Sequence, residues 1–485
     1  MSNQQSNTNE RQAPKVRTLG VLALAGMVVG SMVGAGVFSL PRNFAESTGA
    51  VGAIVAWTIA GAGMLTLVFV FQRLAVRKPK LDAGIYAYAK AGFGDYVGFF
   101  SAFGYWASAC AGNATYWVLI GSALGGLFPG FGAGDTVLAL AVSSVGVWLF
   151  HFVIRRGVRE AAIINSIVTV AKLVPLVLFV IIVAIVGFNW QTFTLNLWGT
   201  GQPDVGALFG QIQSTLLITV FVFLGVEGAT VYSRYAKNRR DVGRATMLGF
   251  LGVLGLFVLV SLLSYGVLPQ DDLQGLRQPS VAGVLESVVG PWGSWMISVG
   301  LVVSVLGAYL AWTLMAAEVL YSAAKSEDAP RFLAKTSKRG VPVAALALTT
   351  IFIQGLLVVT LFSEDAFSFM LKLCSSLALI PYLLTAGYAL KLESRASDDP
   401  AGRSRRGLIT AILATIYTLF LVIAGGSTFL FVSFIIYAPA TVLYVIARRE
   451  RKLRVFTAAE WVICIAALLM AAAAIVALAK GWVVI

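Results

Sequence analysis

Two ionisable side chains stand inside apolar runs of this sequence that are long enough to cross a bilayer. Glu227 lies in the run FVFLGVEGATVYS, between Gly225 and Gly228, and Lys172 lies in the run VTVAKLVPL. A charge inside a membrane is costly, so both residues are expected to have a function. Glu227 would attract a cationic substrate, exchange a proton or stabilise an opened helix. Lys172 either extends to the membrane surface or forms a buried cation that replaces a coupling ion or releases a proton.

A glycine-rich stretch interrupts the first apolar segment. Residues 27–41 read MVVGSMVGAGVFSLP and include Gly30, Ser31, Gly34 and Gly36. Glycine costs about 1 kcal/mol relative to alanine inside a helix, so the helix is expected to open here. Opened backbone at membrane depth must be buried in protein or line a wet cavity, and many transporters build substrate sites from such broken helices. Close helix packing also explains small residues, but the second interruption, around Glu227, favours a substrate site.

Aromatic and polar side chains recur in the other apolar segments. An aromatic face attracts a cation by roughly 0.5–2 kcal/mol, although packing explains each of these residues better when it is taken singly. The candidates are Tyr105, Trp106, Phe221, Phe223 and Trp312, with the polar Asn113, Ser375 and Ser376. The sequence has no nucleotide-binding loop, metal-ligand cluster or set of nucleophile, histidine and acid. We therefore expect neither an enzyme nor a cofactor.

Composition sets the class of protein. Of the 485 residues, 58% are hydrophobic and only 12% are charged, whereas soluble domains are about half apolar and about 25% charged. The sequence therefore predicts a polytopic membrane protein whose partners are small substrates and the lipid bilayer. Apolar runs of bilayer length lie near residues 19–41, 50–72, 95–127, 136–154, 161–187, 208–233, 245–268, 284–324, 342–362, 367–390, 407–424, 428–447 and 458–480.

The basic residues follow this topology. The net charge is +14, yet nearly all of the 36 Lys and Arg residues lie at the N-terminus or in every second connection between predicted spans. Such an alternation marks the cytoplasmic side of a membrane protein. It predicts a cytoplasmic N-terminus and removes the reason to expect a nucleic acid partner. The exceptions are Arg42, Lys172, Arg277, Lys372 and Lys480.

The interrupted segments are the first and the sixth, which is the offset expected of two interlocking five-helix repeats of opposite orientation. Amphipathic connections precede the third and the eighth span, at residues 81–94 and 273–290. The expected divisions are a disordered cytoplasmic N-terminus at 1–17, a first repeat at 18–190, a second repeat at 205–391 and C-terminal spans at 406–485.

The motifs GSMVGAGVFSLP and FLGVEGA resemble the paired signature of the amino acid–polyamine–organocation (APC) superfamily. The chain is most similar to its basic amino acid/polyamine antiporters, especially the arginine–ornithine group, from about residue 18 to about residue 447. The resemblance implies an all-α, LeuT-like fold with twelve to thirteen transmembrane helices, of which spans one and six are broken. It also implies alternating access in a bacterial cytoplasmic (inner) membrane, with a homodimer as a possible assembly.

The resemblance further implies roles for individual residues. Backbone amides would bind the substrate's α-carboxylate, and carbonyl groups of the sixth span would receive its α-amino group. Aromatic rings would act as gates or stack on the substrate, and polar atoms of the third and tenth spans would contact it. Lys172 is similar to a lysine that takes the place of a sodium ion in some members. The substrate-binding residues so implied are Ser31, Gly34, Ala35, Gly36, Tyr105, Asn113, Phe221, Leu224, Trp312, Ser375 and Ser376.

Two positions depart from the pattern of the arginine–agmatine exchangers, because Phe221 replaces a tryptophan and Ala35 replaces a serine. The leading expectation is the exchange of a cationic amino acid, arginine or lysine, for ornithine or a related amine. The first alternative is a proton-coupled amino acid symporter of the same fold, in which Lys172 or Glu227 carries the proton. The second is a transporter-like amino acid sensor, against which the lack of a soluble output domain in the sequence argues.

Overall fold

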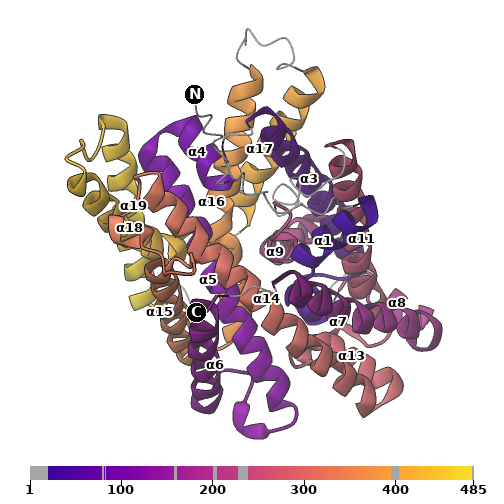
Figure 1. Cartoon of the computed structure of the whole chain (residues 1–485). Helices are drawn as coiled ribbons and strands as arrows, with labels where there is room; N and C mark the ends of the chain where they lie inside the picture. Colours follow the sequence, from indigo (N-terminus) through magenta and orange to yellow (C-terminus); the bar gives the residue numbers. More distant parts are fainter. Residues whose placement is uncertain are drawn as a thin grey trace, which may run out of the picture.

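The computed structural model describes residues 20–78, 81, 84–157, 161–199, 205–227, 239–394, 404–425 and 427–482. The expected N-terminal tail (1–17) and Gly228 lie outside these ranges. Within them the regular structure is entirely helical (Figure 1).

The helices follow the predicted apolar runs closely. The α-helices are α1 (Val21–Met32), α2 (Leu40–Ser47), α3 (Ala50–Arg77), α4 (Ile85–Phe93), α5 (Asp95–Gly125), α6 (Val137–Arg155), α7 (Ala161–Ile182), α8 (Trp190–Leu195), α9 (Val205–Phe223), α11 (Arg239–Ser264), α12 (Gln270–Gly275), α13 (Ser280–Val289), α14 (Pro291–Lys325), α15 (Val343–Val359), α16 (Ala366–Ser394), α17 (Arg405–Ala424), α18 (Ser427–Glu450) and α19 (Ala458–Ala479). A short 3-10 helix, η1 (Gly36–Ser39), precedes α2.

Eleven described helices are long and apolar enough to cross a membrane, and there are twelve if the bent pair Leu24–Met32 and Gly36–Ser47 is one span. The predicted third span, α5, has 31 residues but is not in this set. Its sequence is rich in small and polar residues because nearly all of it is buried among other helices. Figure 1 shows α5 in the middle of the molecule, with α14 and α16 beside it.

The first predicted break is confirmed. Helix α1 ends at Met32, and the helical axis turns by 49° before the chain continues through η1 into α2. In the sixth segment, α9 ends at Phe223, and residues 224–227 form a turn in which Gly225 has φ of +100°. The described helix therefore stops where the sequence predicted an interruption.

One predicted boundary was wrong. The apolar run 284–324 is not a single helix, because α13 ends at Val289 and α14 begins at Pro291. Between them Gly290 has φ of +85°, a left-handed conformation that glycine adopts without steric cost. Gly94 likewise has a left-handed conformation, with φ of +95°, and it separates the short helix α4 from α5. A short helix thus precedes a long one at both amphipathic connections.

The last apolar segment forms α19, which packs on α18. Its buried side is a row of small residues at helical spacing, namely Cys464, Ala467, Ala471 and Ala474. The rest of the helix is largely exposed apolar surface, as expected of a helix that faces lipid.

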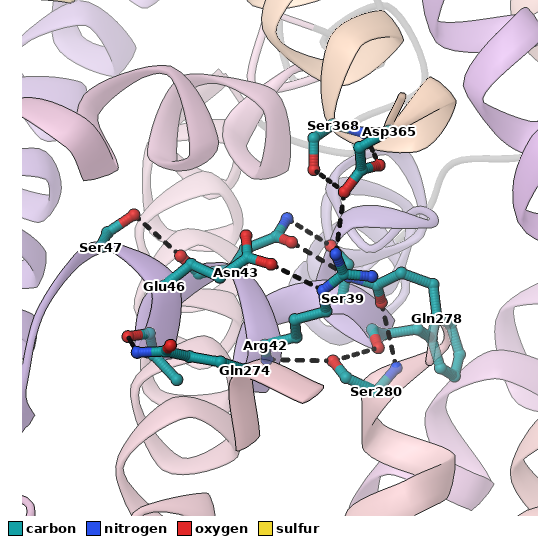
Figure 2. A network of polar contacts seen from close by, with 12 residues as sticks. Ser39, Arg42, Asn43, Glu46, Ser47, Gln274, Gln278, Ser280, Asp365 and Ser368 are labelled. Carbon is teal, nitrogen blue, oxygen red and sulfur yellow. Dashed lines mark hydrogen bonds and ion pairs between the residues drawn. The ribbon is translucent and has the colours of Figure 1, made fainter. Parts of the chain in front are cut away.

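Polar contacts join α2 to the α12–α13 region and to the start of α16 (Figure 2). Arg42 donates to Asp365 at 3.0 Å and to Glu46 at 2.7 Å. Gln278 donates to the Asn43 side chain at 3.0 Å. We call the side of the molecule that holds this network the α13 face, and the opposite side, with α4, the α4 face. The network ties the second half of the broken first span to two neighbouring elements.

Candidate functional site

A cavity lies where the two broken segments approach each other. It is partly open to solvent. The lining residues come from the first break, from the end of α9 and from α5, α14 and α16. They are Ser31, Met32, Gly34, Ala35, Gly36, Ser108, Ala109, Gly112, Tyr116, Phe221, Val222, Leu224, Trp312 and Cys374.

The backbone of the first break supplies unpaired donors to this cavity. Val33 N–H still bonds to Val29 O at 2.9 Å, but the N–H groups of Gly34 and Ala35 have no hydrogen-bond partner within the described residues. They precede the helical segment of η1 and α2, and the start of a helix carries partial positive charge. This part of the cavity is therefore suited to a carboxylate.

The two breaks touch each other through Gly225. A Cβ atom on this residue would lie 2.3 Å from the Ser31 carbonyl oxygen, and φ is +100°. The short distance leaves no space for a side chain, and the positive φ is a conformation that glycine adopts without steric cost. Both observations therefore require glycine. Gly225 thus holds the end of α9 against the end of α1.

Under the transport function that the sequence predicts, Gly225→Ala should abolish substrate uptake and lower the yield of monodisperse protein. A left-handed conformation costs a non-glycine residue about 1–2 kcal/mol, and the contact with Ser31 O adds a clash to that cost. The matched control is Gly210→Ala on α9, the helix that precedes this turn, where nothing in the described structure lies within 4 Å of the added atom. Size-exclusion profiles and uptake by proteoliposomes of both variants check the prediction. Normal uptake by Gly225→Ala would contradict it.

Glu227 is buried at the end of the second break, with 7% of its surface exposed. Its carboxylate accepts hydrogen bonds from the hydroxyl groups of Tyr105 and Tyr382, the latter at 2.8 Å, and from Gly225 N–H at 3.3 Å. Glu227 and the two tyrosines are not among the cavity-lining residues. However, the Tyr105 ring lies 6.4 Å from the ring of Trp312, which does line the cavity. The carboxylate connects the second break to α5 and α16 at the edge of the cavity.

Lys172 is buried on α7, with 2% of its surface exposed. Its ammonium group donates a hydrogen bond to Gly30 O, in the last turn of α1. The alternative in which this side chain extends to the membrane surface is therefore wrong. The contact satisfies a carbonyl group that the end of a helix leaves without a partner.

The remaining predicted site residues divide into two groups. Phe221, Leu224 and Trp312 line the cavity, as do the four predicted residues of the first break. Asn113, Ser375 and Ser376 do not line it. Asn113 donates to Thr313 at 3.1 Å, and Ser375 donates to Leu217 O at 2.6 Å.

The sequence interpretation missed several lining residues. Ser108, Ala109, Gly112 and Tyr116 form one stripe of α5, and their spacing of one, four and eight residues would have identified a shared helix face. Cys374 directly precedes the predicted Ser375 and Ser376. Among the residues that the structure describes, no acidic or basic side chain lines the cavity. The described lining therefore offers a cation aromatic faces rather than a carboxylate.

Comparisons with known proteins find amino acid transporters as relatives of this chain. A sequence profile described as amino acid permease matches residues 19–426. An arginine/ornithine antiporter of Pseudomonas aeruginosa is 46% identical over 468 residues, which cover 95% of this chain and 97% of the relative. An L-lysine transport protein of Corynebacterium glutamicum is 40% identical over 96% of both chains. An arginine/agmatine antiporter of Chlamydia pneumoniae is 38% identical over 90% of this chain and 91% of its own.

Proposed function

Because this chain belongs to the amino acid permease family, we propose that it exchanges a cationic amino acid for ornithine or a related amine across a bacterial inner membrane. Membership confirms the resemblance carried by the two glycine motifs and makes the chain a transporter rather than an enzyme. Relatives named for arginine, ornithine, agmatine and lysine support a cationic substrate. The LeuT-like arrangement of two five-helix repeats, at 18–190 and 205–391, is part of the proposal.

The observation that carries the proposal is the chemistry of the cavity lining. Unpaired N–H groups at Gly34 and Ala35 suit the α-carboxylate of an amino acid. Trp312 and Phe221 provide aromatic faces for a cationic tail, a contact worth about 0.5–2 kcal/mol. A substrate that carries both charges at opposite ends of a short apolar stem fits this lining.

Charge distribution supports the proposed orientation. The connections on the α4 face are rich in Lys and Arg, whereas those on the α13 face include Arg42 and Arg277 together with several acidic residues. The positive-inside rule then assigns the α4 face to the cytoplasm. In this orientation the network of Figure 2 lies on the outer side of the cavity and closes it by linking α2 to α16.

Arg42→Ala and Asp365→Asn are each expected to speed the reaction of Cys374, a cavity-lining thiol, with a membrane-impermeant thiol reagent added outside. The Arg42–Asp365 pair is partly exposed, and such pairs are worth about 0–1 kcal/mol, so the expected increase is at most about fivefold. The double variant should react no faster than the single ones. A Cys374→Ala background serves as the control, and unchanged labelling in both single variants would contradict outer closure by this pair.

Proton-coupled symport is the second candidate function. The observation in its favour is that each break has a buried titratable partner, Lys172 for the first and Glu227 for the second. In that mechanism one of these groups would gain a proton on one side of the membrane and lose it on the other.

One reconstitution experiment separates the two functions. Purified protein is placed in liposomes that contain ornithine, a diamine or neither, and uptake of radiolabelled arginine is followed with and without an imposed pH gradient. Uptake only into preloaded vesicles is the expected result and ranks the internal substrates. Uptake into empty vesicles that follows the pH gradient would overturn the exchange mechanism in favour of symport. Specific binding of arginine without uptake under any condition would indicate a sensor.

A further inference from the structure

We propose that the Tyr116 hydroxyl donates a hydrogen bond to the α-carboxylate of the substrate and thereby selects amino acids over decarboxylated amines. This assignment rests on the exchange function proposed above. Tyr116 lies on α5, lines the cavity and has 6% of its surface exposed. Its hydroxyl oxygen is the atom nearest to the Cβ position of Gly34, at 3.2 Å. The hydroxyl therefore lies against the opened backbone of the first span.

This hydroxyl differs from the others in the cavity lining. The Ser31 hydroxyl donates to Val28 O at 2.8 Å, and the Ser108 hydroxyl donates to Cys374 O at 2.7 Å. Within the described residues the Tyr116 hydroxyl makes no hydrogen bond, and it is not among the fully enclosed polar atoms that lack one. Polar groups in protein interiors normally have a partner. A hydroxyl that faces a cavity with its proton uncommitted is thus positioned for a ligand.

The groups next to the Tyr116 hydroxyl indicate that the ligand binds here through a hydrogen-bond acceptor. The neighbouring N–H groups of Gly34 and Ala35 are also donors without a partner in the described structure. Three donors in the lining of one cavity favour an acceptor with several lone pairs, and an ionised carboxylate offers about four such sites. The described lining residues include no Lys, Arg or His, so within this part of the chain the neutral donors hold the anion.

A consequence for specificity follows from this geometry. Arginine, lysine and ornithine carry the α-carboxylate, whereas agmatine and cadaverine lack it. The Tyr116 hydroxyl then contributes to the binding of the first group only. A hydrogen bond to a charged group is strong enough that its loss weakens binding by about tenfold or more.

The test is the Tyr116→Phe variant, which keeps the ring and its packing and removes only the hydroxyl. Binding of arginine, ornithine and agmatine to the purified full-length protein is measured by calorimetry for the wild type and the variant. We expect the affinity for arginine and ornithine to fall at least about tenfold while that for agmatine stays within about twofold. The matched control is Tyr309→Phe on α14, a buried tyrosine outside the cavity lining, which should leave all three affinities unchanged.

The other outcomes are equally clear. Equal losses for arginine and agmatine would assign Tyr116 to packing of the cavity wall and overturn the proposal, as would an unchanged affinity for arginine. A wild-type protein that binds arginine but fails to exchange it would overturn the exchange function and leave the binding comparison valid. Absence of binding of all three compounds to the wild type would overturn both.

Discussion

Lys172→Met is expected to reduce arginine–ornithine exchange at least about tenfold while the protein still folds. The Lys172 ammonium is buried on α7 and donates to Gly30 O at the end of α1. Methionine fills similar space but leaves that carbonyl oxygen without a donor, and a buried group that loses its partner costs about 1–3 kcal/mol. The end of α1 would then shift away from α7 to reach another donor. Because the lining residues Ser31 and Met32 directly follow Gly30, the carboxylate subsite would be displaced.

The experiment compares uptake into ornithine-loaded proteoliposomes with thermal stability of the purified variants. The variant also removes the cost of burying the lysine amine, which offsets part of the cost of the unpaired carbonyl group, so a transport defect larger than the loss of stability is the expected combination. Lys372→Met is the matched control, because Lys372 lies on α16, is only half-buried and sits 5.8 Å from the centre of the Phe429 ring. Wild-type exchange by Lys172→Met would show that the contact with Gly30 is dispensable. Under the symport alternative the same variant would instead lose its dependence on the pH gradient.

Glu227→Gln is expected to lower exchange by about tenfold or more. Within the described residues the carboxylate accepts from the Tyr105 and Tyr382 hydroxyls and from Gly225 N–H. Glutamine keeps one acceptor oxygen and brings an NH₂ group toward donors. These bonds lose their charged acceptor, and a bond to a charged acceptor is worth about 1.5–3 kcal/mol against about 0.5–1.5 kcal/mol for a neutral one. The end of α9 would no longer be held to both α5 and α16.

Tyr105→Phe and Tyr382→Phe should each reduce exchange less than Glu227→Gln does. Combining Glu227→Gln with Tyr105→Phe should give less than the product of the two separate effects, because both changes disturb the same contact. Glu318→Gln is the control, since Glu318 is an exposed carboxylate elsewhere on α14. Fully multiplicative effects would mean that Glu227 acts independently of Tyr105 and would argue against a shared structural unit at the second break.

Local properties of the sequence were sufficient for the class of protein and for the positions of the breaks. Hydropathy reports which segments can face lipid, and the predicted runs coincide with the helices because lipid exposure depends on each segment's own side chains. Glycine preferences are also local, so the clusters around Gly34 and Gly225 predicted where α1 and α9 end. The same locality explains the error at 284–324. An apolar run continues through Gly290, and only the left-handed conformation of that residue separates α13 from α14.

Only the tertiary structure decided which side chains meet at the breaks. Tyr382 is 155 residues away from Glu227 in the chain, and Lys172 is 142 residues away from Gly30. Tyr116 became a candidate substrate-binding residue only because it contacts Gly34, and no local pattern in the sequence predicts that contact. Hydropathy and helix preference specify each helix by itself, whereas these contacts depend on how α5, α7 and α16 pack around the broken spans. The sequence therefore determined a transporter with two interrupted helices, and the packing of those helices determined the lining of its candidate substrate cavity.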